Sequence, residues 1–242
     1  MKALFDLHTH TLASGHAYST LKENIEEAGR KGLWGMGTSD HAEKMPGSAH
    51  PVFFTNYKVV RESVLGVRIF CGIEANICDF GGTVDVEEDQ LKKLDYVIAS
   101  LHTPCIRSGT ARQNTEAFLH AAENPYVKIL GHPDDSRYPV DYEALVPGAK
   151  ERGAALELNN SSLVPGSTRI DGRKNAARLL EACKKYREPV VLGSDAHIWY
   201  DVGRFEEAFA LLREARFPEK LAIILHDVLP SNLFVRLLSR YR

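Results

Sequence analysis

The chain has 242 residues, of which 44% are hydrophobic and 26% charged, an ordinary composition for a globular protein with one large domain. The net charge of −2 gives no broad basic surface for nucleic acid, and no apolar run approaches the roughly 20 residues that span a membrane. The chain starts without a secretory leader, and its four cysteines form no C-x-x-C pair. We therefore expect a cytoplasmic protein with reduced thiols and a single domain over residues 1–242.

Short apolar runs alternate with longer amphipathic segments along the whole chain. Strands are expected at residues 3–7, 33–39, 67–73, 96–101, 127–130, 154–158 and 190–192, and helices at 20–31, 56–65, 114–123, 142–152, 171–186, 204–215 and 221–241. This alternation favours parallel strands with right-handed crossovers, and the nearly continuous apolar strands indicate burial on both faces. The prediction is an α/β fold, a closed or nearly closed seven-stranded β/α barrel. The alternative is an open doubly wound sheet.

Side chains that can bind metal ions occur where these strands end. His8 and His10 follow the first strand and point to the same side, because side chains alternate along a strand. Further candidates lie in the first loop and after later strands: His16, His41, Glu74, His102, His132, Asp195 and His197. In a β/α barrel, all strands open their carboxyl ends on one face, where active sites are built. The sequence therefore predicts a metal site on that face.

Nine candidate ligands are too many for one catalytic zinc ion, which takes about three from the protein. They suit two or three ions, with Glu74 as a bridge because a carboxylate can bind one metal through each oxygen. Two carboxylates do not neutralise several divalent ions, so the site keeps a strong positive charge. We therefore expect it to bind a phosphate group. Asp6, two residues before His8, is expected to accept a proton from a ring nitrogen and so orient a ligand histidine.

The ordered motifs of the chain resemble a known family. They are Asp6-Leu7-His8-Thr9-His10, Ser39-Asp40-His41, Gly72-Ile73-Glu74-Ala75-Asn76, Gly131-His132-Pro133 and Gly193-Ser194-Asp195-Ala196-His197. Over about residues 4–200 the sequence is similar to the PHP (polymerase and histidinol phosphatase) family. Two further motifs resemble the small stand-alone YcdX-like phosphatases within it, Ser14-Gly15-His16-Ala17-Tyr18-Ser19 and Glu157-Leu158-Asn159-Asn160-Ser161-Ser162. The resemblance implies a distorted (β/α)7 barrel with a trinuclear metal centre, usually zinc.

The resemblance also implies how the ligands are shared. The first metal would bind His8, His10, Glu74 and Asp195. The second would bind Glu74, His102 and His132, and the third would bind His16, His41 and His197. Imidazole and carboxylate ligands also accept manganese or iron, so the sequence leaves the identity of the metals open.

The leading functional hypothesis is metal-dependent hydrolysis of small phosphate monoesters by a metal-bound hydroxide. Glu74, Asp195 and His197 are the expected catalytic residues. Loops that can reach this face carry Arg107, Arg112, Arg137 and Arg169, and Arg137 and Arg107 are the predicted contacts to the substrate phosphate. Asn159 and Asn76 end strands that face the site and are expected to contact substrate or to orient ligand residues. The molecule that the protein binds is then expected to be a small phosphorylated metabolite. Nucleic acid and membranes are disfavoured as binding partners. Oligomeric state cannot be derived from the sequence.

Two other functions stay open at this point. One is an amidohydrolase-like enzyme, although such enzymes commonly use a carboxylated lysine after the fourth strand, and this strand ends in Ala99-Ser100-Leu101-His102. The other is a non-catalytic module that metal ions stabilise. Loss of turnover with a chelator and its return with zinc or manganese would separate catalysis from a purely structural role.

Overall fold

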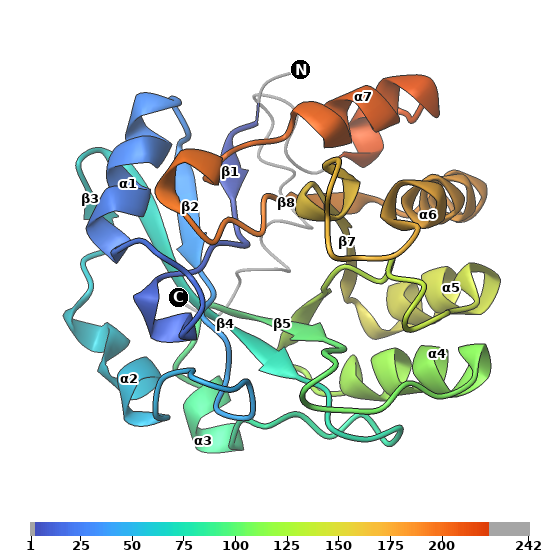
Figure 1. Ribbon diagram of the computed structural model, residues 1–242, viewed down its shortest axis with the longest axis horizontal. Coiled ribbons are helices and arrows are strands. Elements are labelled where there is room, and N and C mark those ends of the chain that lie inside the picture. The colour runs from blue at the N-terminus through green and yellow to red at the C-terminus, as the bar shows by residue number, and fades with distance from the viewer. Residues whose placement is uncertain (1–2, 223–242) are drawn as a thin grey trace.

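The computed structural model describes residues 3–222, in which parallel strands form a ring and helices pack around it (Figure 1). The strands are β1 (Phe5–Asp6), β2 (Gly35–Thr38), β3 (Ser63–Val64), β4 (Val67–Asn76), β5 (Tyr96–Ser100), β6 (Val127–Leu130), β7 (Ala155–Asn159) and β8 (Val190–Gly193). The helices are α1 (Leu21–Arg30), α2 (Val52–Thr55), α3 (Glu88–Leu91), α4 (Ala111–Ala121), α5 (Tyr142–Arg152), α6 (Gly172–Tyr186) and α7 (Glu206–Glu214). Short 3-10 turns occupy parts of the loops between them.

Seven strands pair in parallel in the order β1-β2-β4-β5-β6-β7-β8. The ring is nearly closed between its first and last strands by a parallel bridge from Thr9 to Ala196, where the amide of His10 donates to the carbonyl of Ala196 over 2.8 Å. The predicted seven-stranded β/α barrel is therefore confirmed. Its closure lies among the predicted ligand residues, so the pairing that completes the barrel also positions them.

The interior of the barrel is filled by a large side chain from β5. Tyr96 is buried, and its hydroxyl donates to the carbonyl of Leu7 over 2.5 Å. Two glycines make room for its ring, because a Cβ on Gly37 or Gly72 would lie 2.1 or 2.4 Å from atoms of Tyr96. The Tyr96 side chain therefore packs inside the barrel, and the carboxyl ends of the strands form its open face.

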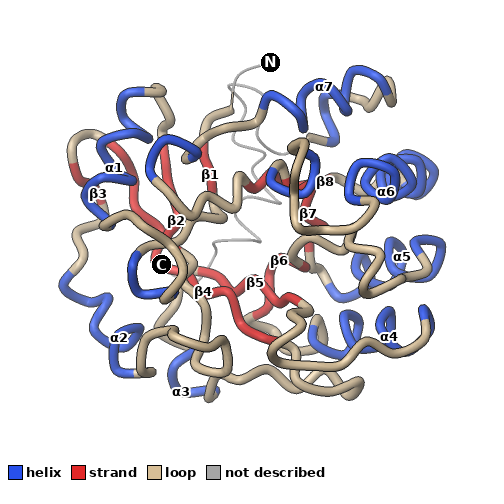
Figure 2. The backbone as a smooth tube through the Cα atoms, viewed as in Figure 1, coloured by secondary structure: helices blue, strands red, loops and turns tan. Residues whose placement is uncertain are grey.

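The long helices follow their sequence signals closely. Helix α1 begins with a capping box, in which Thr20 and Glu23 satisfy each other's backbone amides, and Thr110 and Gln113 do the same for α4. The predicted helices at 114–123, 142–152, 171–186 and 204–215 correspond to α4 to α7, which lie side by side along one part of the ring (Figure 2). Regular βα units thus build this half of the barrel.

The expected helix at 56–65 is wrong. The chain forms α2 earlier, continues through a 3-10 turn at Asn56–Val59, and then enters the short antiparallel strand β3. Leu65 and Gly66 both have positive φ angles, 53° and 80°, which is the geometry of a tight hairpin turn between β3 and β4. That turn folds the segment back onto β4, so a helix cannot continue there.

The expected helix at 221–241 lies almost wholly outside the described residues, and the single-domain organisation over residues 1–242 stays a prediction. None of the helices between residues 3 and 222 combines the length and the apolar character needed to cross a membrane. The cytoplasmic location also stays a prediction.

Candidate metal centre

The structure brings all nine predicted ligand residues to one place, at the carboxyl ends of the strands. Glu74 lies at the middle of this cluster. Its Oε1 is 2.9 Å from Nε2 of His132 and 3.2 Å from Nε2 of His102. Its Oε2 is 2.9 Å from Nδ1 of His41, 3.3 Å from Nε2 of His8 and 3.4 Å from Nε2 of His10. Each carboxylate oxygen therefore faces a different group of imidazoles.

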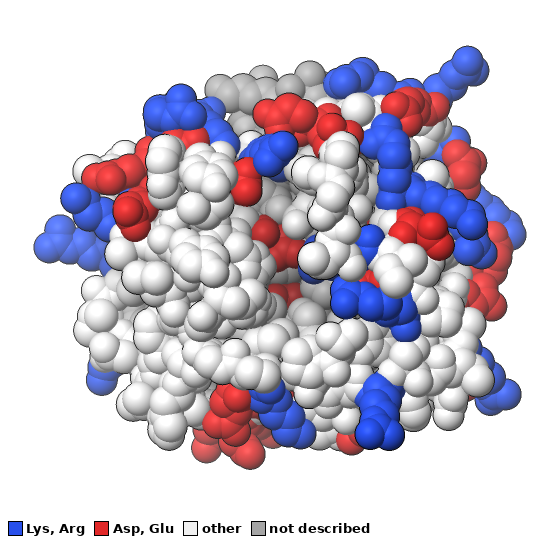
Figure 3. Space-filling view, viewed as in Figure 1, with Lys and Arg blue, Asp and Glu red and all other residues white. Residues whose placement is uncertain are grey.

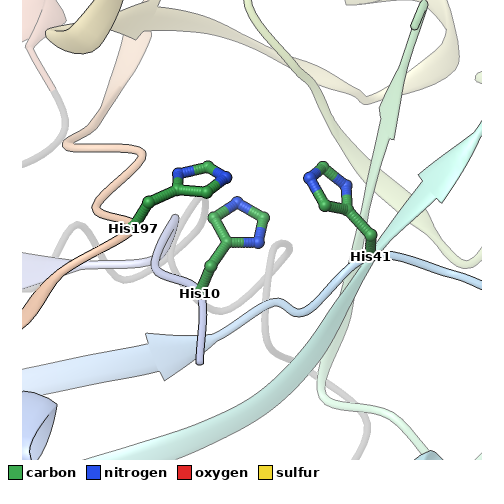
Figure 4. A group of neighbouring side chains, drawn as sticks. All are labelled: His10, His41 and His197. Atoms are coloured by element: carbon green, nitrogen blue, oxygen red, sulfur yellow. The ribbon is translucent and has the colours of Figure 1, made fainter. Parts of the chain in front are cut away.

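Asp195 connects the centre of the cluster to its outer part. Its Oδ1 lies 3.3 Å from Nε2 of His10 and 3.4 Å from Nδ1 of His197. Farther out, Nε2 of His197 lies 3.1 Å from Nε2 of His16. Figure 4 shows the imidazoles of His10, His41 and His197 turned toward one another from three separate strand ends. Their nitrogens lie within 4.8 Å of one another, as do the ligand atoms of His8, His10 and Glu74 and those of His41, Glu74 and His102.

Several buried polar atoms at the middle of the cluster have no hydrogen-bond partner. They are Nε2 of His8, Nε2 of His10, Nδ1 of His41 and Oε2 of Glu74. Buried polar groups are nearly always satisfied, and a cation bound between these four atoms would satisfy all of them. Nitrogen and carboxylate oxygen are also the donors that zinc and related ions prefer. The residues therefore fit divalent metal ions.

The pKa shifts of the residues in this cluster agree with the binding of divalent metal ions. Burial lowers the pKa of His10 well below its usual value and also lowers the pKa of His102. Burial opposes ionisation of Glu74, yet the imidazoles of His41, His8 and His102 hold the pKa of Glu74 well below its usual range. Burial likewise opposes ionisation of Asp195, whose pKa is nevertheless held low by Arg169 and His8. The carboxylates are thus ionised and two of the imidazoles neutral, as metal ligands must be.

His8 differs from the other ligands. Burial works against a charged imidazole, but the carboxylates of Glu157, Glu74 and Asp195 outweigh it and raise the pKa of His8 well above its usual value. The surroundings of His8 therefore favour positive charge strongly, and a divalent cation would supply it without a second proton on the ring.

Glu157 contacts the cluster, although the sequence analysis gave it no role beyond membership of the YcdX-like motif. It lies on β7, and its Oε1 accepts a hydrogen bond from Nδ1 of His8 over 2.7 Å. We predicted this role for Asp6, and that prediction is wrong. Asp6 instead accepts from the backbone amides of His8, Ser194 and Gly203, because its position places the carboxylate against the backbone of neighbouring loops. A charged residue within a buried parallel strand was the available signal for Glu157.

Asn76 and Asn159, predicted to contact substrate or to orient ligand residues, are fully buried and have contacts of the second kind. Oδ1 of Asn76 accepts from Nδ1 of His102 over 2.7 Å, and its amide group donates to Asp85. Nδ2 of Asn159 donates to Oδ2 of Asp195 over 3.2 Å. Because neither side chain has exposed surface, both orient ligand residues instead of reaching a bound molecule.

A polar hollow of about 400 Å³ opens above the cluster. Figure 3 shows a recess near the centre of this face, with acidic atoms inside it and basic atoms beside it. Its lining includes the ligands His16, His41, His102, His132, Asp195 and His197, and also Met45, Leu101, Thr103, Pro104, Asp135, Arg137, Tyr138, Ser161, Thr168, Arg169 and Asp201. A space of this size suits a small molecule.

The predicted arginines do not all reach this hollow. Arg137 lines it, with Nε donating to Oδ2 of Asp135 over 2.8 Å. Arg107 is exposed and is not part of the lining. Arg169, a loop candidate that the sequence analysis did not select as a substrate contact, also lines the hollow and donates to Oδ2 of Asp195 over 2.7 Å. The hollow therefore carries two guanidinium groups, one of them against a candidate metal ligand.

Comparison with known proteins identifies the family. Residues 6–161 match the model of the PHP domain. The chain belongs to the PHP domain family. It is 43% identical over 223 residues to a probable phosphatase of Clostridium botulinum, covering 92% of this chain and 90% of the relative. It is 46% identical over 224 residues to a probable phosphatase of Thermoanaerobacter, covering 92% and 91%.

Two solved structures share the fold. One is the histidinol phosphate phosphatase of Lactococcus lactis, solved with zinc, L-histidinol and phosphate, with a TM-score of 0.62, 19% identity, and coverage of 90% of this chain and 95% of that one. The other, a putative histidinol phosphatase of Listeria monocytogenes, has a TM-score of 0.61 at 17% identity and covers 85% and 99%. At these identities, the likeness establishes the barrel architecture of this family member.

Proposed function

We propose that this PHP domain protein is a metal-dependent phosphatase that hydrolyses small phosphate monoesters. The observation that carries the proposal is the group of buried, unpartnered ligand atoms around Glu74, which lies directly beneath the polar hollow. The names of relatives at 43% and 46% identity, which align over nine-tenths of this chain, support the same reaction class.

We infer three metal positions. His8, His10, Glu74 and Asp195 would hold the first ion, and Glu74, His102 and His132 the second, with one Glu74 oxygen facing each group. His16, His41 and His197 would hold the third, and the 3.1 Å approach of the His16 and His197 nitrogens supports shared coordination. The donor set favours zinc, and it also accepts manganese or iron.

When bound, such ions lower the pKa of coordinated water and neutralise charge on phosphoryl oxygens. The residues of the chain supply the charge and the contacts that bind the substrate phosphate. Two ligand carboxylates cannot neutralise three divalent ions, so the floor of the hollow attracts a phosphate dianion. Arg137 and Arg169 add positive charge on the wall, where a guanidinium group can bind two phosphate oxygens at once. Glu74, Asp195 and His197 are the residues we propose as catalytic through the metals they hold.

The substrate class follows from the size and lining of the hollow. A volume of about 400 Å³ holds a small metabolite, and the polar side chains of Thr103, Tyr138 and Ser161 suit a hydroxylated or amino-bearing leaving group. A net charge of −2 does not favour nucleic acid as the partner.

The deciding experiment combines metal analysis of protein purified without a tag with a panel of phosphorylated compounds. The panel includes sugar phosphates, nucleotides, histidinol phosphate and pyridoxal phosphate. We expect phosphate release that a chelator abolishes and that zinc or manganese restores. Protein that carries its metals but releases phosphate from no member of the panel would overturn the phosphatase proposal and favour a non-catalytic, metal-stabilised module.

A further inference from the structure

Glu157 contacts two candidate ligand residues that come from different strands. Its side chain is buried, and its Oε1 accepts from the ring nitrogen Nδ1 of His8 over 2.7 Å. Its Oε2 accepts from the backbone amide of His132 over 2.8 Å and from Nδ2 of Asn159 over 3.1 Å. One carboxylate on β7 thus connects the end of β1 with the end of β6.

The surrounding backbone leaves space for this carboxylate. Gly193 lies on the neighbouring strand β8, and a Cβ at that position would lie 1.8 Å from Oε1 of Glu157 and 2.8 Å from Cβ of His8. Any side chain at residue 193 would push Glu157 away from His8. The glycine is therefore a requirement of the contact between Glu157 and His8.

The contact with His132 stabilises an unusual backbone. His132 has a φ of 28°, which residues with a side chain rarely adopt, and its amide is buried. The hydrogen bond to Oε2 of Glu157 satisfies that amide. The same conformation turns the imidazole of His132 toward Oε1 of Glu74, 2.9 Å away.

Other ligand rings have neutral partners on their second nitrogen. Nδ1 of His10 lies 3.0 Å from the hydroxyl of Ser14, and Nδ1 of His102 lies 2.7 Å from the amide oxygen of Asn76. The carboxylate of Glu157 instead brings a negative charge to His8. It keeps the proton on Nδ1, so that Nε2 stays free to bind a metal, and it raises the basicity of the ring.

We propose that Glu157 is a positioning residue that couples the His8 and His132 ligand positions, so that the two metal positions sharing Glu74 are preorganised together. This inference rests on the metal centre of the proposed function and not on the phosphatase reaction. Loss of Glu157 should weaken both of these positions and leave the group of His16, His41 and His197 with its affinity.

The test is Glu157→Gln, which keeps the size and removes the second acceptor oxygen. If the amide group faces His132, two N–H donors oppose each other, and if it faces His8, the proton moves to Nε2 and blocks the metal. We expect zinc at the two positions that share Glu74 to bind about 10–100-fold more weakly. Competition with a chelator, together with the zinc-to-protein ratio at fixed free zinc, measures this without any turnover.

Glu27→Gln is the matched control. Glu27 is also a buried glutamate, on α1, where it pairs with Arg30. We expect this variant to lower the melting temperature and to keep zinc affinity. Wild-type zinc affinity in folded Glu157→Gln, or equal zinc loss in both variants, would overturn the proposal.

Glu157→Asp covers the case in which Glu157→Gln does not fold. It keeps the charge but is one methylene too short to reach His8 and His132 together, so we expect weaker zinc binding with an intact fold. Unchanged zinc affinity in this variant would also overturn the proposal. If phosphatase activity is absent from the wild type but zinc is lost from these variants, the coupling stands and the proposed function fails.

Discussion

The inner and outer parts of the metal centre differ in how firmly the protein holds its ligands. In the inner part, the side chains of His8, His10 and Glu74 are at most 1% exposed, and carboxylate or hydroxyl groups fix the rings of His8 and His10. In the outer part, His16 is exposed, the His197 side chain is 31% exposed, and Nδ1 of His197 contacts a backbone carbonyl. We infer from this difference that the proposed inner ions would bind in a preformed site and the proposed outer ion in a looser one.

The strongest test of this comparison is Glu74→Gln. The variant loses the charge and one of the two oxygens that face the inner histidines, so we expect it to lose at least two metals. Phosphatase kcat/KM should fall on the order of 10³-fold, as when a major electrostatic contribution is removed. Metal analysis and steady-state kinetics on the same preparation measure both effects. Full metal content in the variant would contradict the bridging role of Glu74.

Acidification should remove the outer metal before the inner ones. Ligand histidines must be neutral, so protons compete with metal as the pH falls. Desolvation and the neighbouring imidazoles lower the pKa of His16 and of His10, so both rings stay neutral until the pH falls below the usual 6.5. The order of release follows from exposure, because His16 is exposed to solvent and His10 is buried. We therefore expect stepwise release of metal below about pH 6.5, followed with a metal-sensitive dye. Unchanged metal content at about pH 5 would contradict this order and the ligand assignment.

His16→Ala should have a smaller effect than Glu74→Gln, because His16 contributes to the outer metal alone. We expect the loss of one metal, a fall in activity of about 10–100-fold, and an unchanged melting temperature. The measurements are metal stoichiometry, kinetics and thermal unfolding. Equal metal loss in His16→Ala and Glu74→Gln would remove the distinction between the two parts of the centre.

The smallest predicted effect concerns the wall of the hollow. Arg137→Ala should raise KM about tenfold without loss of metal, since it removes one partly exposed contact to the substrate phosphate. Arg107→Ala is the matched control, because Arg107 is exposed outside the hollow, and its kinetics should match the wild type. A larger change in KM for Arg107→Ala than for Arg137→Ala would contradict the proposal that Arg137 contacts the substrate phosphate.

Local sequence signals were sufficient for much of this architecture. Apolar runs marked the strands of the barrel, and the residues after them, such as His41 and His132, are the ones that the fold gathers. Parallel strands in a barrel send all their carboxyl ends to one face, so position along the chain was enough to predict that these side chains meet. The helix predicted at 56–65 failed because a hairpin turn at Leu65 and Gly66 pairs the segment with β4.

The sequence by itself predicted which residues the fold gathers into the candidate metal centre and on which face of the barrel they lie. The tertiary structure decided their supporting contacts: Glu157, 149 residues away, and not Asp6, accepts the hydrogen bond from Nδ1 of His8. It also buried Asn76 and Asn159 and placed Arg137 and Arg169, but not Arg107, on the hollow. The physical reason is that strand and helix periodicity depend on neighbouring residues, whereas a side chain's hydrogen-bond partner depends on distant segments that meet only in the closed barrel.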